Sequence, residues 1–389
     1  ILHETFNYGI GAQYMINKGN YITADCYADH FSSSYCFFKD NKTYNGKAGE
    51  EQVRKRTRNH NLSIKGIFKL GNRHKLSVGT EYIVDVLKSQ TDNIAKEDAY
   101  TLALFAQDEI KLLRNLQALI GVRYIYHENF KNHATPNVAL MYKPGKFNFR
   151  ASYAAGFRTP TLSELYATDI AKKNDRLTIG NLDLKPEKNN YFSLSAEYVH
   201  ERFSVSVNAF YNNIRDMIDY NTIATGDKAM EQYGHKEVRQ RDNIAEAKVH
   251  GINVSANAYL GAGFNLSGGY THLNTQDVEL EQPIDKSIKN AYNINAQWAH
   301  SWKIYRLNIN LNGRINSKRF SKSYGYAPEY QLWDLNTRHS FNLKSVIIEP
   351  GFGMENLFDY MDDRPYNSNY ATLTPGRSFY ISLSLKFKS

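Results

Sequence analysis

The sequence predicts an all-β protein, a transmembrane antiparallel β-barrel. Three observations lead to this prediction: side chains alternate between apolar and polar, the alternating segments share one length, and short links alternate with long ones. The alternation is strictest in residues 378–388, where one face holds Phe379, Ile381, Leu383, Leu385 and Phe387. Because successive side chains of a strand point to opposite faces, this segment has one apolar face and one polar face.

The same alternation recurs along the chain. It is clear in residues 203–211, 252–259, 292–298 and 305–312. The polar positions hold mainly Asn, Ser, Arg and Lys, which are costly to bury without partners and suit a water-filled lumen. A tilted transmembrane strand needs about nine to eleven residues, and we expect the segments that contain these alternating stretches to have that length.

The links between the predicted strands are alternately short and long. Short links are expected near residues 16–20, 70–73, 112–115, 143–146, 200–202, 260–263, 301–303 and 342–344. Longer loops are expected near residues 29–54, 88–98, 157–188, 218–246, 275–289, 317–329 and 359–376. This arrangement is typical of outer-membrane barrels. About 17 strands result, an odd number, whereas bacterial barrels have an even one. We therefore expect this chain to be the C-terminal portion of a longer protein.

Composition narrows the protein class. The 389 residues have a mean hydropathy of −0.57 and no run of eighteen apolar residues, so a helical membrane protein is excluded. The 29 Tyr and 20 Phe fit aromatic girdles of a barrel. The net charge of +9 is scattered apart from a basic run at residues 54–58. Without a recognised motif we expect no nucleic-acid binding, and we expect a basic face toward anionic lipid or ligand.

Cysteine usage leaves two interpretations open. Cys26 and Cys36 lie close in sequence around a predicted loop. They form either a loop disulfide, as in an oxidising compartment, or two unlinked thiols. Two cysteines cannot supply a structural zinc site alone, and no other metal-ligand spacing is evident.

Two charged motifs bracket the long loop at residues 157–188. At its start, Gly156 is expected to allow a bend, Pro160 to end the strand, and Arg158 to lie among acceptors at the base of the loop. At its end, residues 185–187 (Lys-Pro-Glu) lead into the next strand. The interpretation is a structured loop with paired charges. No catalytic group is evident here or elsewhere, so we expect no enzyme activity.

These motifs resemble those of the TonB-dependent receptors of the Gram-negative outer membrane. The matching residues are Gly156, Phe157, Arg158, Pro160, Glu164, Leu165, Gly180, Asn181, Leu184, Lys185, Pro186 and Glu187. Residues 355–359 (Glu-Asn-Leu-Phe-Asp) and 375–377 (Pro-Gly-Arg) resemble the C-terminal part of the family, and Phe387 matches its terminal assembly signal. The resemblance implies a barrel of the 22-stranded type, of which about 17 strands occupy residues 1–389, with the first strands and the N-terminal plug absent from this sequence.

By resemblance, the function is TonB-driven import of a scarce large nutrient. The expected cargo is an iron chelate (siderophore) or haem, with cobalamin as the alternative within the family and a passive porin as the alternative outside it. Residues 161–180 contain no His, although haem receptors usually carry one between these motifs. Expected partners are TonB, through the missing N-terminal region, outer-membrane lipid, and in some members a surface lipoprotein. No bound cofactor is expected.

Aromatic and basic residues of the predicted outer loops are the candidate ligand-binding residues, because they stack on flat ligands and pair with anionic chelates. They are Arg158, Tyr166, Tyr220, Tyr233, His235, Arg239, Tyr324, Tyr326, Tyr366 and Tyr370.

Overall fold

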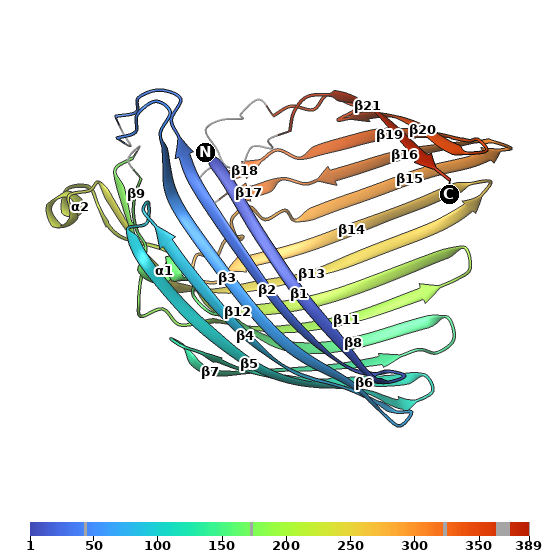
Figure 1. The fold of residues 1–389 in the computed structure, drawn as a ribbon, viewed down its shortest axis with the longest axis horizontal. Helices are drawn as coiled ribbons and strands as arrows, with labels where there is room; N and C mark the ends of the chain where they lie inside the picture. The colour runs from blue at the N-terminus through green and yellow to red at the C-terminus, as the bar shows by residue number, and fades with distance from the viewer. Residues whose placement is uncertain (43–44, 172–173, 322–324, 363–373, 389) are drawn as a thin grey trace. The chain divides into compact units, whose positions relative to one another are not determined.

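The computed structural model describes residues 1–42, 45–171, 174–321, 325–362 and 374–388, most of which form antiparallel β-strands (Figure 1). Seventeen strands in this described part are long, in agreement with the predicted number. They are β1 (Leu2–Asn17), β2 (Asn20–Cys36), β3 (Glu51–Leu70), β4 (His74–Ser89), β5 (Ile94–Leu113), β6 (Leu116–His127), β7 (Lys131–Tyr142), β8 (Phe147–Arg158), β11 (Glu187–Val199), β12 (Phe203–Thr225), β13 (Glu237–Gly261), β14 (Phe264–Asp277), β15 (Asn290–Trp302), β16 (Tyr305–Asn316), β19 (Tyr330–Asn342), β20 (Val346–Glu355) and β21 (Ser378–Phe387).

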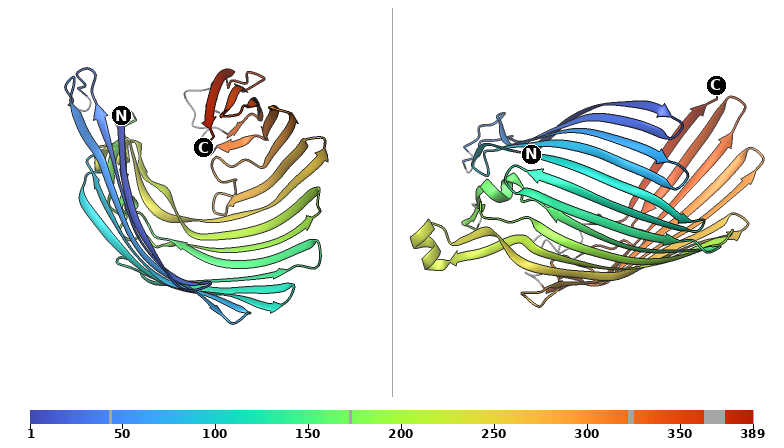
Figure 2. Two further views of the ribbon diagram at one scale, coloured as in Figure 1. Left: turned by 45° about the vertical axis from the view of Figure 1, so that its right-hand side comes forward. Right: turned by 90° about the horizontal axis from the view of Figure 1, so that it is seen from below.

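The chain divides into two compact units. Unit 1 comprises Ile1–Leu140, Ser152–Tyr191 and Ile214–Glu246, and unit 2 comprises Met141–Ala151, Phe192–Asn213 and Ala247–Ser389. Within unit 1, each of β1 to β5 pairs antiparallel with the next strand, so that the meander runs from β1 to β6. Within unit 2, the same meander runs from the Ala247 end of β13 through β14, β15, β16, β19 and β20 to β21 (Figures 1 and 2). No described helix is both long and apolar enough to cross a membrane.

The sheet of unit 2 has the predicted apolar and polar faces. Along the first part of β12, exposed apolar side chains alternate with less exposed polar ones. The opposite, polar face carries its own hydrogen bonds: the Asn295 amide donates to Asn310 and to Asn312, both at 2.6 Å. An exposed apolar face opposite a hydrogen-bonded polar face is what the strands of a transmembrane barrel have, with one face toward lipid and the other toward the lumen. The predicted fold class is confirmed.

The last strand, β21, shows how this sidedness is built. Its exposed apolar face includes Leu383, at 66 % exposure, and Phe387, at 80 %. On the polar face the Tyr380 hydroxyl donates to the Asn336 amide oxygen at 2.5 Å. Gly353, the register partner of Tyr380, makes room for this ring, because a Cβ there would lie 2.1 Å from it.

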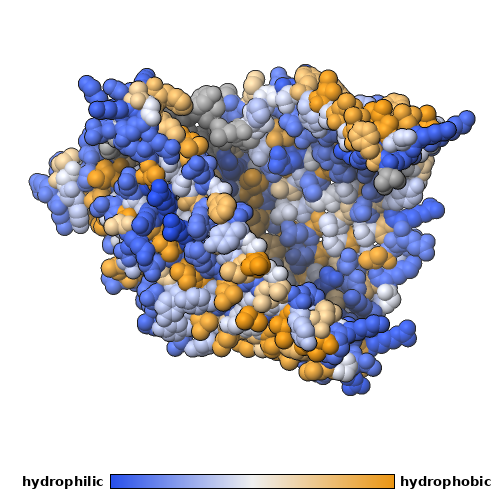
Figure 3. Space-filling model, in the orientation of Figure 1, coloured by the Kyte–Doolittle hydropathy of each residue, from blue (hydrophilic) through white to orange (hydrophobic). Residues whose placement is uncertain are grey.

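In unit 1, one face of the sheet is covered at the loop ends of the strands. Helix α1 (Leu162–Tyr166) packs on β4 and β5. Leu87, Ser89 and Ala99, which share a face of these two strands, are buried there. The alternate positions, such as Tyr82 and Leu102, are exposed. We call these the covered face and the outward face of unit 1. Figure 3 shows mixed hydrophilic and hydrophobic patches on the surface of the molecule.

Aromatic side chains form bands across neighbouring strands, as the composition predicted. In unit 1, Tyr100 contacts both Tyr82 and Tyr126, with ring centroids 6.0 and 6.1 Å apart. In unit 2, Tyr305 stacks on Trp302 at 5.6 Å and contacts Phe341 at 5.1 Å, next to the short turns. Such bands are expected at membrane interfaces.

Several predicted loops are shorter than the sequence suggested. Strand β2 continues to Cys36 and β3 starts at Glu51, where a loop from 29 to 54 was expected. The link between β4 and β5 is only residues 90–93. The link of residues 128–130 between β6 and β7 is also short, so the alternation of short and long links is not complete. Strand pairing continues beyond the apolar band, where neither face needs apolar residues and the sequence pattern disappears.

The disulfide alternative is wrong in this structure. Cys26 and Cys36 both belong to β2 and are free. A strand rises about 3.3 Å per residue, so ten residues separate the two by about 33 Å. Disulfide-bonded Cα atoms lie about 4.4–6.8 Å apart.

Candidate functional site

The segment between β8 and β11 is a structured loop, as the motifs predicted. It holds α1, β9 (Thr168–Ala171) and β10 (Arg176–Ile179). Helix α1 starts with a capping box: the Thr161 hydroxyl accepts from the Glu164 backbone N–H at 3.2 Å, and the Glu164 carboxylate accepts from the Thr161 backbone N–H at 2.8 Å. Both otherwise free backbone donors are thereby satisfied.

Arg158 joins the two family motifs. Its guanidinium donates to Glu164 at 2.9 Å and to Glu187 at 2.6 Å. Glu187 also accepts from the Ile218 backbone N–H at 2.8 Å, which ties in strand β12. Bidentate arginine–carboxylate pairs fix geometry as well as charge. The guanidinium of Arg158, a candidate ligand residue, is therefore already paired with two carboxylates, one at the start of the loop and one at its end.

The carboxyl of Glu164 responds to two opposing effects. Burial raises its pKa, but the hydrogen bonds from Arg158 and from Thr161 outweigh burial and hold the pKa below the ordinary value of 4.5. The carboxylate is therefore ionised at neutral pH. Its negative charge is required for both the helix cap and the arginine pair.

The two motif glycines are explained by close approach, not by bending. Gly156 lies within β8, where a Cβ would be 2.3 Å from the Asn189 side-chain oxygen, so the predicted bend is wrong. At Gly180 a Cβ would be 2.4 Å from the Leu165 carbonyl oxygen. This close contact lets the next residue, Asn181, donate its backbone N–H to the Glu164 carbonyl at 3.0 Å. The Gly-Asn motif therefore packs directly on α1.

Asn243 on β13 is a residue that the sequence did not reveal. Its amide oxygen accepts from the Lys185 backbone N–H at 2.7 Å, and its amide nitrogen donates to the Lys185 carbonyl at 2.8 Å. The same nitrogen donates to the Asp216 carbonyl at 2.7 Å. One side chain thus links the Lys-Pro-Glu motif to strands β12 and β13. Asn243 has no distinctive neighbours in sequence, so no local signal could have found it.

A small hydrophobic cluster lies beneath these polar contacts. Leu165, Leu184 and Ile218 are buried together, and Phe130 and Tyr166 pack against them. Burial, with a smaller contribution from the charge of Glu97, raises the pKa of Tyr166. The side chain of Tyr166, a predicted ligand residue, therefore packs against other residues of unit 1.

The second structured loop joins β12 to β13 through α2 (Gly226–Tyr233). Here β10 pairs in parallel with the start of β13 and antiparallel with β9. Tyr233, another candidate, packs against the buried cluster of Ala224, Ala229 and Val238. These contacts fix the loop against the two short strands.

Three polar candidates of this loop make side-chain contacts near its surface. His235 contacts Asp175 at 2.9 Å, and this hydrogen bond lowers the pKa of the Asp175 carboxyl. Arg239 pairs with Glu237 at 2.5 Å. Tyr220, 39 % exposed, accepts a hydrogen bond from the Arg241 guanidinium, which lies 3.5 Å from its ring centroid. An exposed tyrosine beside an arginine is suited to a flat anionic ligand.

In unit 2, Tyr326 lies in β18 (Gly325–Ala327), which pairs with β17 (Arg319–Ser321). It is 57 % exposed and packs edge-on against Phe320. The candidates Tyr324, Tyr366 and Tyr370 lie outside the described residues.

The C-terminal family motif, residues 355–359 and 375–377, is also held together by hydrogen bonds. Asn356, only 4 % exposed, donates to the carbonyls of Tyr360 at 2.7 Å and Pro375 at 3.1 Å. Asp359 accepts from the Arg377 backbone N–H at 2.7 Å. The two halves of the C-terminal motif thus contact each other, 18 residues apart in the chain.

Comparison with known proteins agrees with this architecture. A family model described as "TonB dependent receptor-like, beta-barrel" matches residues 3–357. Among solved structures, a mutant of the ferric enterobactin receptor PfeA from Pseudomonas aeruginosa gives a TM-score of 0.81 at 18 % identity, covering 99 % of this chain and 62 % of that one. The siderophore receptor PirA from Acinetobacter baumannii gives 0.74 at 16 % identity, covering 99 % and 62 %.

The FrpB iron transporter from Neisseria meningitidis is more distant, with a TM-score of 0.73 at 12 % identity, covering 97 % of this chain and 62 % of that one. At these identities the solved structures show a shared fold. This chain spans 62 % of the length of each of the three. The family model, in contrast, covers most of the sequence, including the Arg158 loop. The chain therefore belongs to the TonB-dependent receptor β-barrel family.

Proposed function

We propose that the full protein imports an iron–siderophore complex across the outer membrane of a Gram-negative bacterium, with energy supplied through TonB. The observation that carries this proposal is the family match over residues 3–357. The fold shared with two siderophore receptors supports the choice of cargo class. Import, and not chemical conversion, is the expected activity.

The candidate cargo-binding residues also favour an anionic, aromatic chelate. Arg241, which is partly buried, lies over the ring of the exposed Tyr220, and Arg239 lies two residues from Arg241 on β13. Guanidinium groups pair with anionic oxygens, and tyrosine stacks on flat rings. A ferric chelate with aromatic, negatively charged arms offers both groups.

The test is growth of a deletion strain under iron limitation with single iron sources: aromatic siderophores, hydroxamate siderophores and haem. A parallel culture measures cobalamin-dependent growth. We expect loss of growth on one siderophore class, and restoration by the intact gene but not in a strain without TonB. A growth defect confined to haem or to cobalamin would identify that compound as the cargo and would refute the siderophore proposal. Uptake that continues without TonB would indicate a passive pore.

Binding measurements test the residues. Arg241→Ala in the full-length protein should weaken binding of the identified chelate about tenfold, because one ion pair and one stacking partner are lost. Arg202→Ala, an exposed arginine at the short turn between β11 and β12, is the matched control and should bind normally. If Arg241→Ala and wild type bound with equal affinity, Arg241 would not be part of the cargo site.

A further inference from the structure

A group of cations lies on the outward face of unit 1, on the side of the sheet opposite α1. Along β3, the side chains of Arg56, Arg58, Leu62 and Ile64 are exposed at alternate positions, so they share one face. The strand register places Lys88 of β4 directly beside Arg56. These three cations therefore project from the same face as the exposed apolar residues of β3.

The register also gives the level of these cations relative to the aromatic band. Leu62 pairs with Tyr82, a member of the band, and Tyr82 pairs with Leu102. Arg58 precedes Leu62 by four residues, which is about 13 Å along the strand. The cations thus lie just beyond the aromatic band, toward the loops. At a membrane surface this is the level of lipid head groups.

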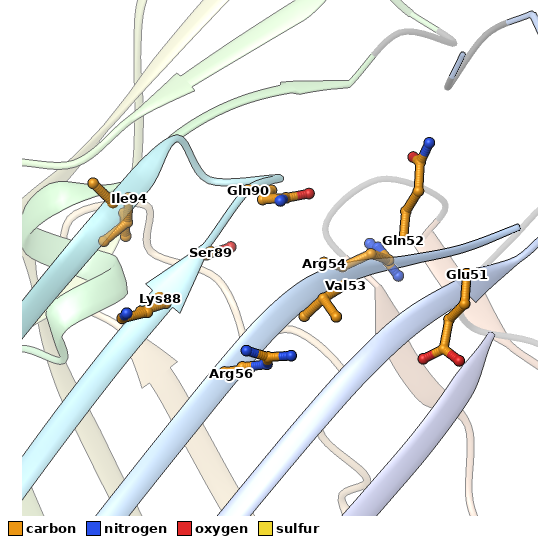
Figure 4. Close-up of a pocket in the computed structure, with 10 residues that line it drawn as sticks. Glu51, Gln52, Val53, Arg54, Arg56, Lys88, Ser89, Gln90 and Ile94 are labelled. Carbon is orange, nitrogen blue, oxygen red and sulfur yellow. The ribbon is translucent and has the colours of Figure 1, made fainter. Parts of the chain in front are cut away.

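A recess with a volume of about 810 Å³ opens at this level, at the loop ends of β3 to β5, and Ser89 of the covered face also lines it. Its lining includes three cations, one carboxylate and several neutral polar groups (Figure 4). The charged lining residues are Arg54, Arg56, Lys88 and Glu51. A second groove, of about 420 Å³, adjoins it along β1 to β3 and also contains Arg56 and Arg58. Together the two hollows hold an excess of positive charge.

The cations are available for a ligand. The side chains of Arg56, Arg58 and Lys88 form no hydrogen bond or ion pair with another described residue. Two nearby carboxylates are already engaged: Glu4 accepts from the Ser32 hydroxyl at 3.3 Å, and Asp98 pairs with Lys96 at 3.2 Å. Glu51, which lines the recess, forms no ion pair with these three cations. Three unpaired cations near one apolar face would repel each other unless an anion lies among them.

We infer that this recess binds the phosphorylated head group of an outer-leaflet lipid, with Arg56, Arg58 and Lys88 as phosphate ligands. The apolar residues of β3 below it would contact the acyl chains of the same molecule. The inference rests on the proposed outer-membrane location and is independent of the cargo. A cargo site is not favoured here, because these residues face away from α1 and the structured loop.

Native mass spectrometry of the full-length protein in detergent tests this inference, with purified lipopolysaccharide as the probe. Arg56→Gln combined with Lys88→Gln should lower lipopolysaccharide affinity about thirtyfold, since each of the two cations near a membrane surface contributes on the order of 1 kcal/mol. The matched control, Lys65→Gln with Lys111→Gln, removes two exposed cations elsewhere on β3 and β5 and should bind as wild type.

Two further arms identify the ligand chemistry. Chemically dephosphorylated lipopolysaccharide should bind wild type as weakly as the intact lipid binds the double variant, and excess inorganic phosphate should not displace the intact lipid. Displacement by phosphate would indicate a free-anion site and overturn the lipid assignment, as would equal lipid binding by the two double variants. Siderophore uptake should stay unchanged in the Arg56–Lys88 variant. A failure of uptake in wild type would refute the proposed function without affecting this result.

Discussion

Arg158 is the residue through which the β8–β11 loop is attached to the sheet. Replacing it with Met keeps the aliphatic chain but leaves Glu164 and Glu187 facing each other without a cation. We expect a local destabilisation of about 1 kcal/mol, a value reduced by solvent screening because the Arg158 side chain is 42 % exposed. Limited proteolysis of residues 159–186 should become faster. Lys228→Met, an exposed change in α2, is the control, and equal cleavage of both variants would contradict the prediction.

The same loop should depend on pH. The folded-state pKa of Glu164 is lowered below 4.5, so its contribution to stability is fully present above that pH. The contribution is lost as the pH falls through the lowered folded pKa. The protection factor of the α1 amides, which is the intrinsic exchange rate at each pH divided by the observed rate, should therefore fall below about pH 4.5. In Glu164→Gln the protection factor should be low throughout and vary little across this range; a wild-type profile in that variant would show that another group is responsible.

Asn243 is predicted to hold the Lys-Pro-Glu motif by hydrogen bonds alone. Asn243→Ala removes three of them, from two backbone sites of Lys185 and one of Asp216. The expected loss is about 1–3 kcal/mol, because backbone groups lose their partners. Thermal unfolding in detergent measures it, with Asn257→Ala, an exposed asparagine on the same strand, as the control. A similar midpoint for both variants would mean that water replaces the Asn243 side chain.

The cysteines give a simple chemical prediction. Because Cys26 and Cys36 are free thiols on one strand, unfolded protein should take up two alkyl groups without prior reduction. Mass spectrometry of the alkylated protein, with and without reductant, checks this. A mass that increases only after reduction would show that Cys26 and Cys36 are linked by a disulfide.

At the scale of the element, the alternation in β21 makes a paired prediction. Leu383→Lys puts a charge on the exposed apolar face and should destabilise the folded barrel by about 2–4 kcal/mol. Ser384→Lys puts the same charge on the polar face, where the register places Glu349 opposite, and should be tolerated. Urea unfolding of the full-length protein in lipid vesicles compares the two. Equal destabilisation would show that the two faces do not differ in environment.

The strands also show where sequence patterns stop being informative. Alternation located the membrane-spanning part of β12, because lipid on one side imposes apolar residues there. It did not locate the extension of β2 to Cys36 or the start of β13 at Glu237, since hydrogen bonding alone continues those strands in water. Element ends outside the apolar band therefore depend on pairing with neighbours.

At the scale of the whole molecule, the two faces should be distinguishable by spin labels in lipid vesicles. Labels at Val205, Ile309 and Leu383, all on apolar faces, should be quenched by oxygen dissolved in lipid. Labels at the adjacent positions Ser206, Asn310 and Ser384 should respond to a water-soluble nickel complex, because the polar faces are hydrated. The reverse pattern would contradict the barrel assignment.

The sequence by itself determined the fold class, the number of long strands and the location of the motif-bearing loop. Each of these follows from local chemistry: apolar residues every second position, turn residues between them, and charged motifs at Arg158 and Glu187. Only the tertiary structure decided which residues those motifs contact. Asn243 meets Lys185 across 58 residues of chain, and Lys88 meets Arg56 through strand register. Such contacts arise from hydrogen-bonded pairing between distant segments, which no local pattern encodes.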